Sequence, residues 1–153
     1  MLPAASRLTK SHEFSTVVRR GRRAGRSRLV IHALEPGRRA ELRAAGQGAR
    51  GRVGSRGQSV SRPTHGIGEP PRVGLVVSKA VGIAVVRHRV ARRLRHLMRE
   101  RLALLPAGTL VVVRALSPAA DASSHELGTD LDAALRKLRL AAVGGERPAT
   151  GSP

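Results

Sequence analysis

The stretch from Lys79 to Arg101 constrains the fold of this chain more than any other. Four apolar side chains in it recur at i, i+4, i+8 and i+11, the spacing of one helix face: Val86, Val90, Leu94 and Leu97. On a helical wheel of about 100° per residue, basic side chains gather on the opposite face: His88, Arg89, Arg92, Arg95, His96 and Arg99. The stretch therefore predicts an amphipathic helix from about residue 84 to residue 104, with one buried face and one cationic face.

Three short, apolar, β-branched stretches predict the strands of a small sheet: Arg28–Leu34, Arg72–Val77 and Thr109–Ala115. The third stretch is apolar on both faces, so we expect it in the centre of the sheet. Residues 79–82 would then make a tight connection between the second strand and the amphipathic helix.

A first helix is predicted over residues 11–20, because Phe14, Val17 and Val18 lie at helical spacing and Gly21 is a natural stop. A last helix begins at the capping-box pattern of Ser123. Its leucine stripe continues to about residue 142: Leu127, Leu131, Leu135 and Leu138. The order of these elements predicts a two-layer α/β (α+β) sandwich, with a small sheet and three helices.

Residues 36–71 differ in composition from the rest of the chain. They contain eight glycines, seven arginines and almost no large apolar side chains. Such a segment cannot offset its ordering entropy by burial, so we predict a disordered basic insertion between two strands, not a linker between domains. We therefore expect one domain over residues 1–143, interrupted by this insertion, and a disordered tail over residues 144–153.

The charge of the chain indicates a polyanionic partner. There are 29 Lys and Arg residues against 10 Asp and Glu, which gives a formal charge of +19. This surplus raises self-repulsion in the folded state, and nucleic acid, anionic lipid or an acidic protein could neutralise it. Genomic base composition accounts for much of the preference for arginine over lysine, but it does not explain the net charge.

The sequence also limits the compartment. The absence of cysteine excludes disulfides and thiolate chemistry. The first ten residues lack the apolar run of a signal peptide, and no stretch approaches the roughly 20 apolar residues of a membrane span. We expect a cytoplasmic protein with no membrane partner and no obligate protein partner.

Patterns for catalysis or metal binding are weak. Asp130 and Asp132 are two residues apart, so they point to different faces of the last helix. His88 and His96 are the only histidines at a possible ligand spacing, and they lie on the cationic face, where like charges disfavour a metal ion. Lys79 follows a serine, but the phosphate-binding GxxxxGK[ST] pattern is absent. We expect no catalytic residue in the protein.

The cationic face leaves more than one partner open. Phe14 is the only aromatic residue, so the stacking platforms typical of single-strand binders are scarce, and Phe14 itself suits the core. His32 can stack on a base or simply lie at a strand surface. A membrane-surface or calmodulin-type helix would carry a bulky exposed apolar face. Here the helix lies between two predicted strands, and its apolar face is required to pack against their sheet. A ribosomal protein or an RNA chaperone remains the alternative reading.

The segment RVGLVVSKAVGIAVVRHRVARRLR resembles the protein subunit of bacterial ribonuclease P. In that family a strand and a Ser-Lys turn precede a glycine connection and a helix with an Arg-Asn-Arg-x-x-[Lys/Arg]-Arg signature. Residues 73–79 match the strand and turn, and residues 81, 82 and 84 match the connection. The signature arginines correspond to Arg87, Arg89, Arg92 and Arg93. His88 and Ala91 replace family residues in the helix, and Ile83 replaces the asparagine after Gly82.

The resemblance extends beyond this segment. Residues 7–8, 13–14 and 19–21 resemble the family's opening, and residues 111–114, 117–118 and the last leucine-rich helix resemble its end. Val18 and His32 stand where the family has aromatics, and residues 36–71 are longer than its usual connection. The fold implied is ribosomal-protein-S5-domain-2-like, a mixed sheet with a left-handed βαβ crossover around Lys79–Gly82.

The resemblance also implies a function. Such a subunit binds the large catalytic RNA of ribonuclease P and the 5′ leader of precursor tRNA. It assists magnesium-dependent removal of the leader, while the RNA holds the Mg²⁺ and performs the catalysis. The implied RNA-binding residues are Lys79, Arg87, His88, Arg89, Arg92, Arg93 and Arg95. The residues implied to line the leader cleft are Phe14, Val18, Val30 and His32.

Overall fold

The structure is a computed structural model that describes residues 2–48 and 70–140. The predicted tail at 144–153 and most of the predicted insertion lie outside the described residues. The helices and strands, in chain order, are α1 (Ser11–Arg20), β1 (Arg22–Gly25), β2 (Leu29–Leu34), α2 (Pro36–Gly48), β3 (Arg72–Val77), α3 (Ala84–Arg101), β4 (Leu110–Ala115) and α4 (Ser124–Lys137).

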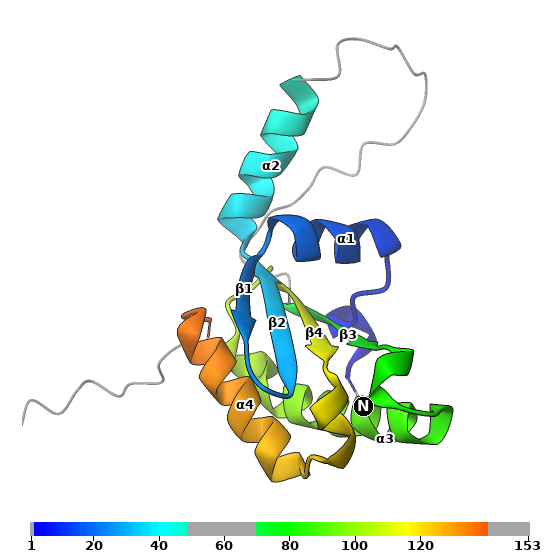
Figure 1. Cartoon of the computed structure of the whole chain (residues 1–153). Helices are drawn as coiled ribbons and strands as arrows, with labels where there is room; N and C mark the ends of the chain where they lie inside the picture. The colour runs from blue at the N-terminus through cyan, green and yellow to red at the C-terminus, as the bar shows by residue number, and fades with distance from the viewer. Residues whose placement is uncertain (1, 49–69, 141–153) are drawn as a thin grey trace, which may run out of the picture.

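The strands form one mixed sheet in the order β1-β2-β4-β3 (Figure 1). β1 pairs with β2 and β2 with β4 in antiparallel fashion, whereas β3 and β4 are parallel neighbours. Since α3 joins β3 to β4, these elements make the expected βαβ unit. The prediction that the strand ending at Ala115 lies inside the sheet is confirmed.

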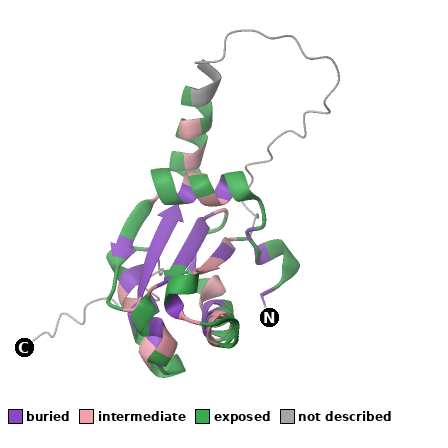
Figure 2. Cartoon of the chain, turned by 45° about the vertical axis from the view of Figure 1, so that its right-hand side comes forward, coloured by how far each residue is buried: buried purple, intermediate pink, exposed green. Residues whose placement is uncertain are grey.

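The larger core lies between the sheet, α3 and α4, which Figure 1 shows below the strands. The apolar face predicted for the amphipathic helix is buried there, and Figure 2 shows how burial follows the sheet-facing sides of the elements. From α3 come Val90, Leu94, Leu97 and Met98, and from α4 come Leu127, Leu131, Ala134 and Leu135. The helical stripes read from the sequence therefore form this core.

The smaller core lies on the other face of the sheet, beneath α1. Val17 of α1 is fully buried against Leu34, Leu110 and Val112 of the two inner strands. The side chains of Leu8, Phe14, Leu42 and Val76 complete this core. The two cores place α1 and α3 on opposite faces of one sheet.

The predicted start of α4 is confirmed, but its end differs. The Glu126 backbone N–H donates to Ser123 Oγ at 3.1 Å, and the Ser123 N–H donates to Glu126 Oε2 at 2.8 Å. This reciprocal pair satisfies two of the open N–H groups at the helix start. The helix ends at Lys137, and Arg139 takes a positive φ of 55°.

Two elements depart from the prediction. β1 is an edge strand in which only Ala24 is buried, so its residues carry no apolar alternation from which a strand could be read. The prediction of disorder over residues 36–71 is wrong for Pro36–Gly48, which form α2. Proline is favoured in the first helical turn, and the Ala, Glu, Leu and Arg residues that follow are good helix formers. The fold thus has four α-helices within the described ranges.

Within residues 2–48 and 70–140, no helix has both the length and the apolar composition needed to cross a membrane.

Candidate nucleic-acid interface

The outward face of α3 carries the predicted cations. His88, Arg89, Arg92 and Arg95 are all exposed, as are the two further basic residues of that face, His96 and Arg99. Arg87 and Arg93 are half-buried at the borders of the apolar stripe. The helical wheel therefore placed these side chains correctly, with one face toward the core and the other toward solvent.

The turn before α3 adds Lys79. This exposed residue begins a short 3₁₀ turn, Lys79–Val81, that leads to Gly82. Gly82 has a φ of 154°, and a Cβ there would press on the side chain of Val86. Glycine thus lets the chain turn sharply into the helix, which keeps Lys79 beside the start of the cationic face.

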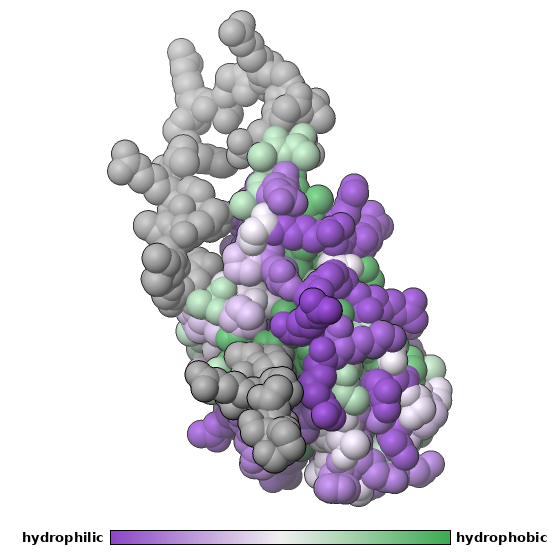
Figure 3. All heavy atoms as spheres, turned by 90° about the vertical axis from the view of Figure 1, so that its left-hand side faces the viewer, coloured by the Kyte–Doolittle hydropathy of each residue, from purple (hydrophilic) through white to green (hydrophobic). Residues whose placement is uncertain are grey.

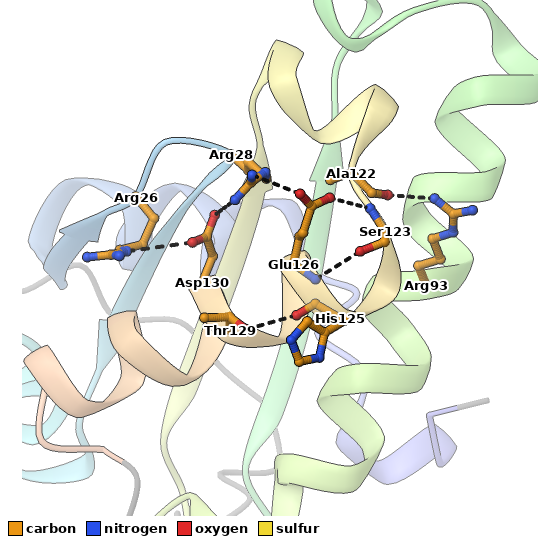
Figure 4. A network of polar contacts seen from close by, with 9 residues as sticks. All are labelled: Arg26, Arg28, Arg93, Ala122, Ser123, His125, Glu126, Thr129 and Asp130. Carbon is orange, nitrogen blue, oxygen red and sulfur yellow. Dashed lines mark hydrogen bonds and ion pairs between the residues drawn. The ribbon is translucent and has the colours of Figure 1, made fainter.

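Arg93 and Arg87 differ from their exposed neighbours. Arg93 Nη1 donates to the carbonyl oxygen of Ala122 at 2.7 Å, which ties α3 to the segment before α4 (Figure 4). Arg87 Nε is buried and has no hydrogen-bond partner among the described residues. These two guanidinium groups are held close to the protein, whereas Arg89, Arg92 and Arg95 extend into solvent.

Most acidic side chains are engaged away from this face, and the one acid of α3, Glu100, lies 3.5 Å from His96 near the end of the helix. Glu13 pairs with Arg72, Glu35 with Arg22, and Asp132 with Arg101. Glu126 and Asp130 both pair with Arg28, at 3.2 and 3.4 Å (Figure 4). In the part of the chain that the structure describes, the α3 arginines from 87 to 99 have no ion pair. Their charge is therefore uncompensated.

A groove runs between α3 and the start of α4. Its wall includes Arg89, Arg92, Arg93, His96 and, from α4, Ser124. Ser124 was not predicted as a site residue, although the capping-box pattern beside it marked a helix start. α4 therefore contributes a hydroxyl group to the groove, while the carboxylate of Glu126 occupies the N-terminus of the helix.

The α1 side of the sheet brings the other predicted residues onto one face. The ring of Phe14 packs directly on Gly74 of β3, where any Cβ would collide with it. Gly74, Val112, His32 and Arg23 occupy one row across the four strands, by their pairing register. Val30 is buried one row along, and Val18 is 43% exposed on α1. Gly74, on which Phe14 packs, is therefore two strand spacings from His32, roughly 10 Å.

His32 is the unusual residue on this face. It is only 8% exposed, and its Nδ1 has no hydrogen-bond partner in the described part of the chain. Burial lowers the pKa of His32 below its ordinary value, and the nearby charges of Arg23 and Arg114 lower it further. The imidazole is therefore neutral at pH 7. Sequence reasoning did not single out either arginine, because only strand pairing places them beside His32.

The two predicted groups meet at the edge of β3. A hollow there has Phe14 and Leu75 in its wall together with Arg7 and Arg95. Arg95 comes from the cationic face of α3 and Phe14 from the opposite layer. The surfaces on the two sides of the sheet are thus joined around its edge strand.

The carboxylates form no common site. Asp130 is buried toward Arg26 and Arg28 in the turn between β1 and β2, whereas Asp132 faces Arg101 of α3. Their expected separation onto different helix faces is confirmed. Among the residues described, no group of three or more His, Asp or Glu side chains lies close enough to hold a metal ion.

Fold and surface together define a small α+β protein with an uncompensated cationic helix on one layer. A model of the ribonuclease P family matches residues 2–139 of the chain. The ribonuclease P protein component of Streptomyces avermitilis is 51% identical over 141 residues, which cover 90% of this chain and 95% of that protein. The component from Corynebacterium diphtheriae is 44% identical over 138 residues, with 90% and 97% covered.

Solved structures of more distant proteins share the fold. The RNase P protein of Staphylococcus aureus superposes with a TM-score of 0.62 at 18% identity, covering 89% of this chain and 97% of that one. The RNase P protein of Thermotoga maritima gives a TM-score of 0.59 at 16% identity, covering 86% and 96%. The chain belongs to the ribonuclease P protein component family. Membership associates it with the RNA subunit of ribonuclease P and with tRNA processing.

Proposed function

We propose that this chain binds the catalytic RNA of ribonuclease P through the outward face of α3 and holds the 5′ leader of precursor tRNA on the α1 side of the sheet. It would thereby assist magnesium-dependent removal of the leader, which produces the mature 5′ end of the tRNA. The RNA subunit would perform the cleavage itself.

The observation that carries this proposal is the uncompensated charge of α3. Arg89, Arg92 and Arg95 are exposed and have no acidic partner among the described residues. Guanidinium groups bind phosphate oxygens bidentately, and each phosphate contact releases a counterion, which favours binding at moderate salt. His88 and Lys79 add donors beside them, while Arg87 and Arg93 would contact RNA with the atoms that the protein leaves free.

The leader-binding part rests on the opposite face. Phe14 packs over Gly74, and Val18 lies one helical turn further along α1. The hollow that contains both Phe14 and Arg95 offers a continuous path from this face to α3. A single strand held there would lie beside the RNA subunit and be fixed relative to it. His32 and Val30 would form the floor of the leader-binding surface further along the sheet.

The ion pairs of the acidic side chains support a metal site in the RNA and not in the protein. Six acidic side chains of the described residues are in ion pairs with basic side chains: Glu13, Glu35, Glu100, Glu126, Asp130 and Asp132. Carboxylates engaged in this way are poor ligands for Mg²⁺, which prefers oxygen donors in near-octahedral geometry. The metal would accordingly be held by the RNA, and the protein residues would act by binding and orienting the two RNAs.

Reconstitution tests this function. The protein is added to a ribonuclease P RNA at low Mg²⁺ concentration, and cleavage of precursor tRNA at the 5′ end is measured against the RNA alone. We expect stimulation that depends on the leader, so a substrate with a one-nucleotide leader should gain less than one with a long leader. No stimulation would refute the proposal, and equal stimulation of both substrates would refute its leader-binding part.

A further inference from the structure

A second cationic groove lies between α1 and α2, on the opposite side of the sheet from α3. Its wall is formed by His12, Ser15, Arg19 and Arg20 of α1 and by Leu42 and Ala45 of α2. Figure 1 shows that α2 projects from the end of the sheet beside α1. The groove exists because part of the long segment after β2 folds as a helix.

The first half of α2 is fixed to the body of the protein. Leu42 packs against the smaller core, and Arg39 Nη2 lies 3.4 Å from Glu13 Oε1 of α1. The same carboxylate receives two hydrogen bonds from Arg72, at 3.0 and 3.1 Å. Glu13, the one acid of α1, is therefore engaged in joining α1, α2 and β3, and it is not part of the groove wall.

The charge of the groove is left without compensation. Arg19 and Arg20 are exposed, and neither forms an ion pair with any acid in the described ranges. Lys10, directly before α1, and Arg23 of β1 are also exposed. Figure 3 shows that hydrophilic side chains dominate the adjoining side of the molecule, which carries β1. The acidic Glu41 of α2 is exposed but lies outside the wall.

The chemistry of the wall favours phosphate. Two guanidinium groups, an imidazole and the Ser15 hydroxyl all offer donors, and arginine binds phosphate oxygens as a fork. Among the described residues the wall contains no Phe, Tyr or Trp, so the usual platforms for base stacking are missing. Its apolar part, Leu42 and Ala45, is too small to insert into a bilayer. A nucleic-acid backbone fits this open groove better than a membrane surface does.

We propose that the α1–α2 groove is a second RNA-binding site, which holds the phosphate backbone of an RNA segment independently of its sequence. This inference rests on the proposed function, because it gives the ribonucleoprotein a contact beyond α3 and the leader face. The RNA could come from either of two sources, the RNA subunit or the tRNA part of the substrate. Both would present the same ligand chemistry to the groove.

The sharpest test uses the exposed Ala45. Glutamate and lysine both suit a helix, and A45E and A45K place opposite charges in the wall. Glu41 lies four residues before position 45 and slightly favours lysine there, so circular dichroism checks that both variants keep α2. We expect A45E to bind RNA roughly 3- to 10-fold more weakly than A45K, with the larger difference at low salt. Equal affinities of the two variants for both RNAs would overturn the inference.

Two binding assays identify the source of the RNA. One measures affinity for the ribonuclease P RNA alone, and the other measures affinity of the assembled ribonucleoprotein for precursor tRNA. R19A/R20A should reduce the slope of log affinity against log salt by up to about two units in one of them. A matched control, R136A/K137A, removes the same charge from α4. Equal losses from the two double variants would overturn the inference, because net charge alone would then explain them.

The wild-type protein separates this inference from the function on which it rests. If it binds neither RNA, the proposed function fails and the groove site fails with it. If it binds and stimulates cleavage while the Ala45 variants do not differ, only the groove site fails.

Discussion

Arginine has opposite roles on two sides of this molecule. On the outward face of α3, Arg89, Arg92 and Arg95 extend into solvent with no acidic partner in the described part of the chain. Where α4 meets its neighbours, arginines are paired: Arg28 with Glu126 and Asp130 (Figure 4), and Arg101 with Asp132. The paired arginines join secondary-structure elements to each other, and the unpaired ones remain available for a partner.

The difference shows why net charge alone does not locate a binding surface. A charge of +19 describes the whole chain, but the few acids neutralise particular arginines and leave others free. Arg101, for example, belongs to α3, yet its Nε donates to Asp132 Oδ1 at 2.7 Å and its Nη1 to the Leu97 carbonyl at 2.8 Å. It is therefore a link between α3 and α4, although it belongs to the same basic stretch as Arg89 and Arg92.

The largest effect is expected where the unpaired arginines are reversed. R89E/R92E should weaken binding to the ribonuclease P RNA roughly 100-fold and reduce the slope of log affinity against log salt by about two units. Its thermal unfolding should change little, because both side chains are exposed. Filter binding over a series of salt concentrations measures the affinity and the slope, and calorimetry measures the unfolding.

The control for this variant has the same charge change on another helix. R136E/K137E reverses two exposed cations of α4 and should lose much less affinity. If R89E/R92E keeps the wild-type slope, the outward face of α3 is merely solvated and the contrast between the two sides disappears.

The next effect concerns a paired site and should appear in stability instead. Glu13 is buried, at 9% side-chain exposure, and holds both Arg72 and Arg39. E13A removes the carboxylate that accepts two hydrogen bonds from Arg72, which we expect to cost about 3 kcal/mol of unfolding free energy. Denaturant unfolding measures the loss, and E13Q, which retains the shape and an acceptor, should lose less. Affinity for RNA per folded molecule should be unchanged. If E13A is as stable as the wild type, the paired arginines do not stabilise the fold, and the contrast with the unpaired arginines of α3 is wrong.

Pairing of this kind could not be read from the sequence. Arg72 and Glu13 are 59 positions apart, and Arg28 and Asp130 are 102 apart. Local periodicity reports which side of a helix faces the core, and it correctly gave the bounds of α1 and the two faces of α3. It does not report which distant side chain lies opposite. Sorting the arginines into paired and unpaired groups therefore required the fold.

Local patterns also failed where an element has little apolar content. β1 has one buried residue, Ala24, and it is held by pairing with β2. α2 has one half-buried leucine, Leu42, and its glycines suggested disorder. Both elements gain stability from tertiary contacts, which propensity within the segment does not reveal. The unpredicted candidates for RNA contact lie beside α2, as Arg19 and Arg20 do, or on β1, as Arg23 does.

The smallest expected effect concerns a single proton on the buried His32, which lies beside two exposed arginines without an acidic partner among the described residues. Burial, Arg23 and Arg114 lower the pKa of His32 in the folded state. The unfolded chain then binds more protons than the folded one as the pH falls below about 6.5, the ordinary value for histidine. Stability should consequently decrease on acidification from pH 7 through the lowered pKa.

H32F removes this proton and the unpaired Nδ1, so its melting temperature should decrease less than that of the wild type over the same range. R114Q should weaken the dependence as well, since it removes one of the two charges that disfavour the imidazolium. H88Q controls for the loss of an exposed histidine and should follow the wild type. If H32F and the wild type have parallel pH profiles, the positive charge of Arg23 and Arg114 does not act on the sheet face, and their role as unpaired cations beside His32 is wrong.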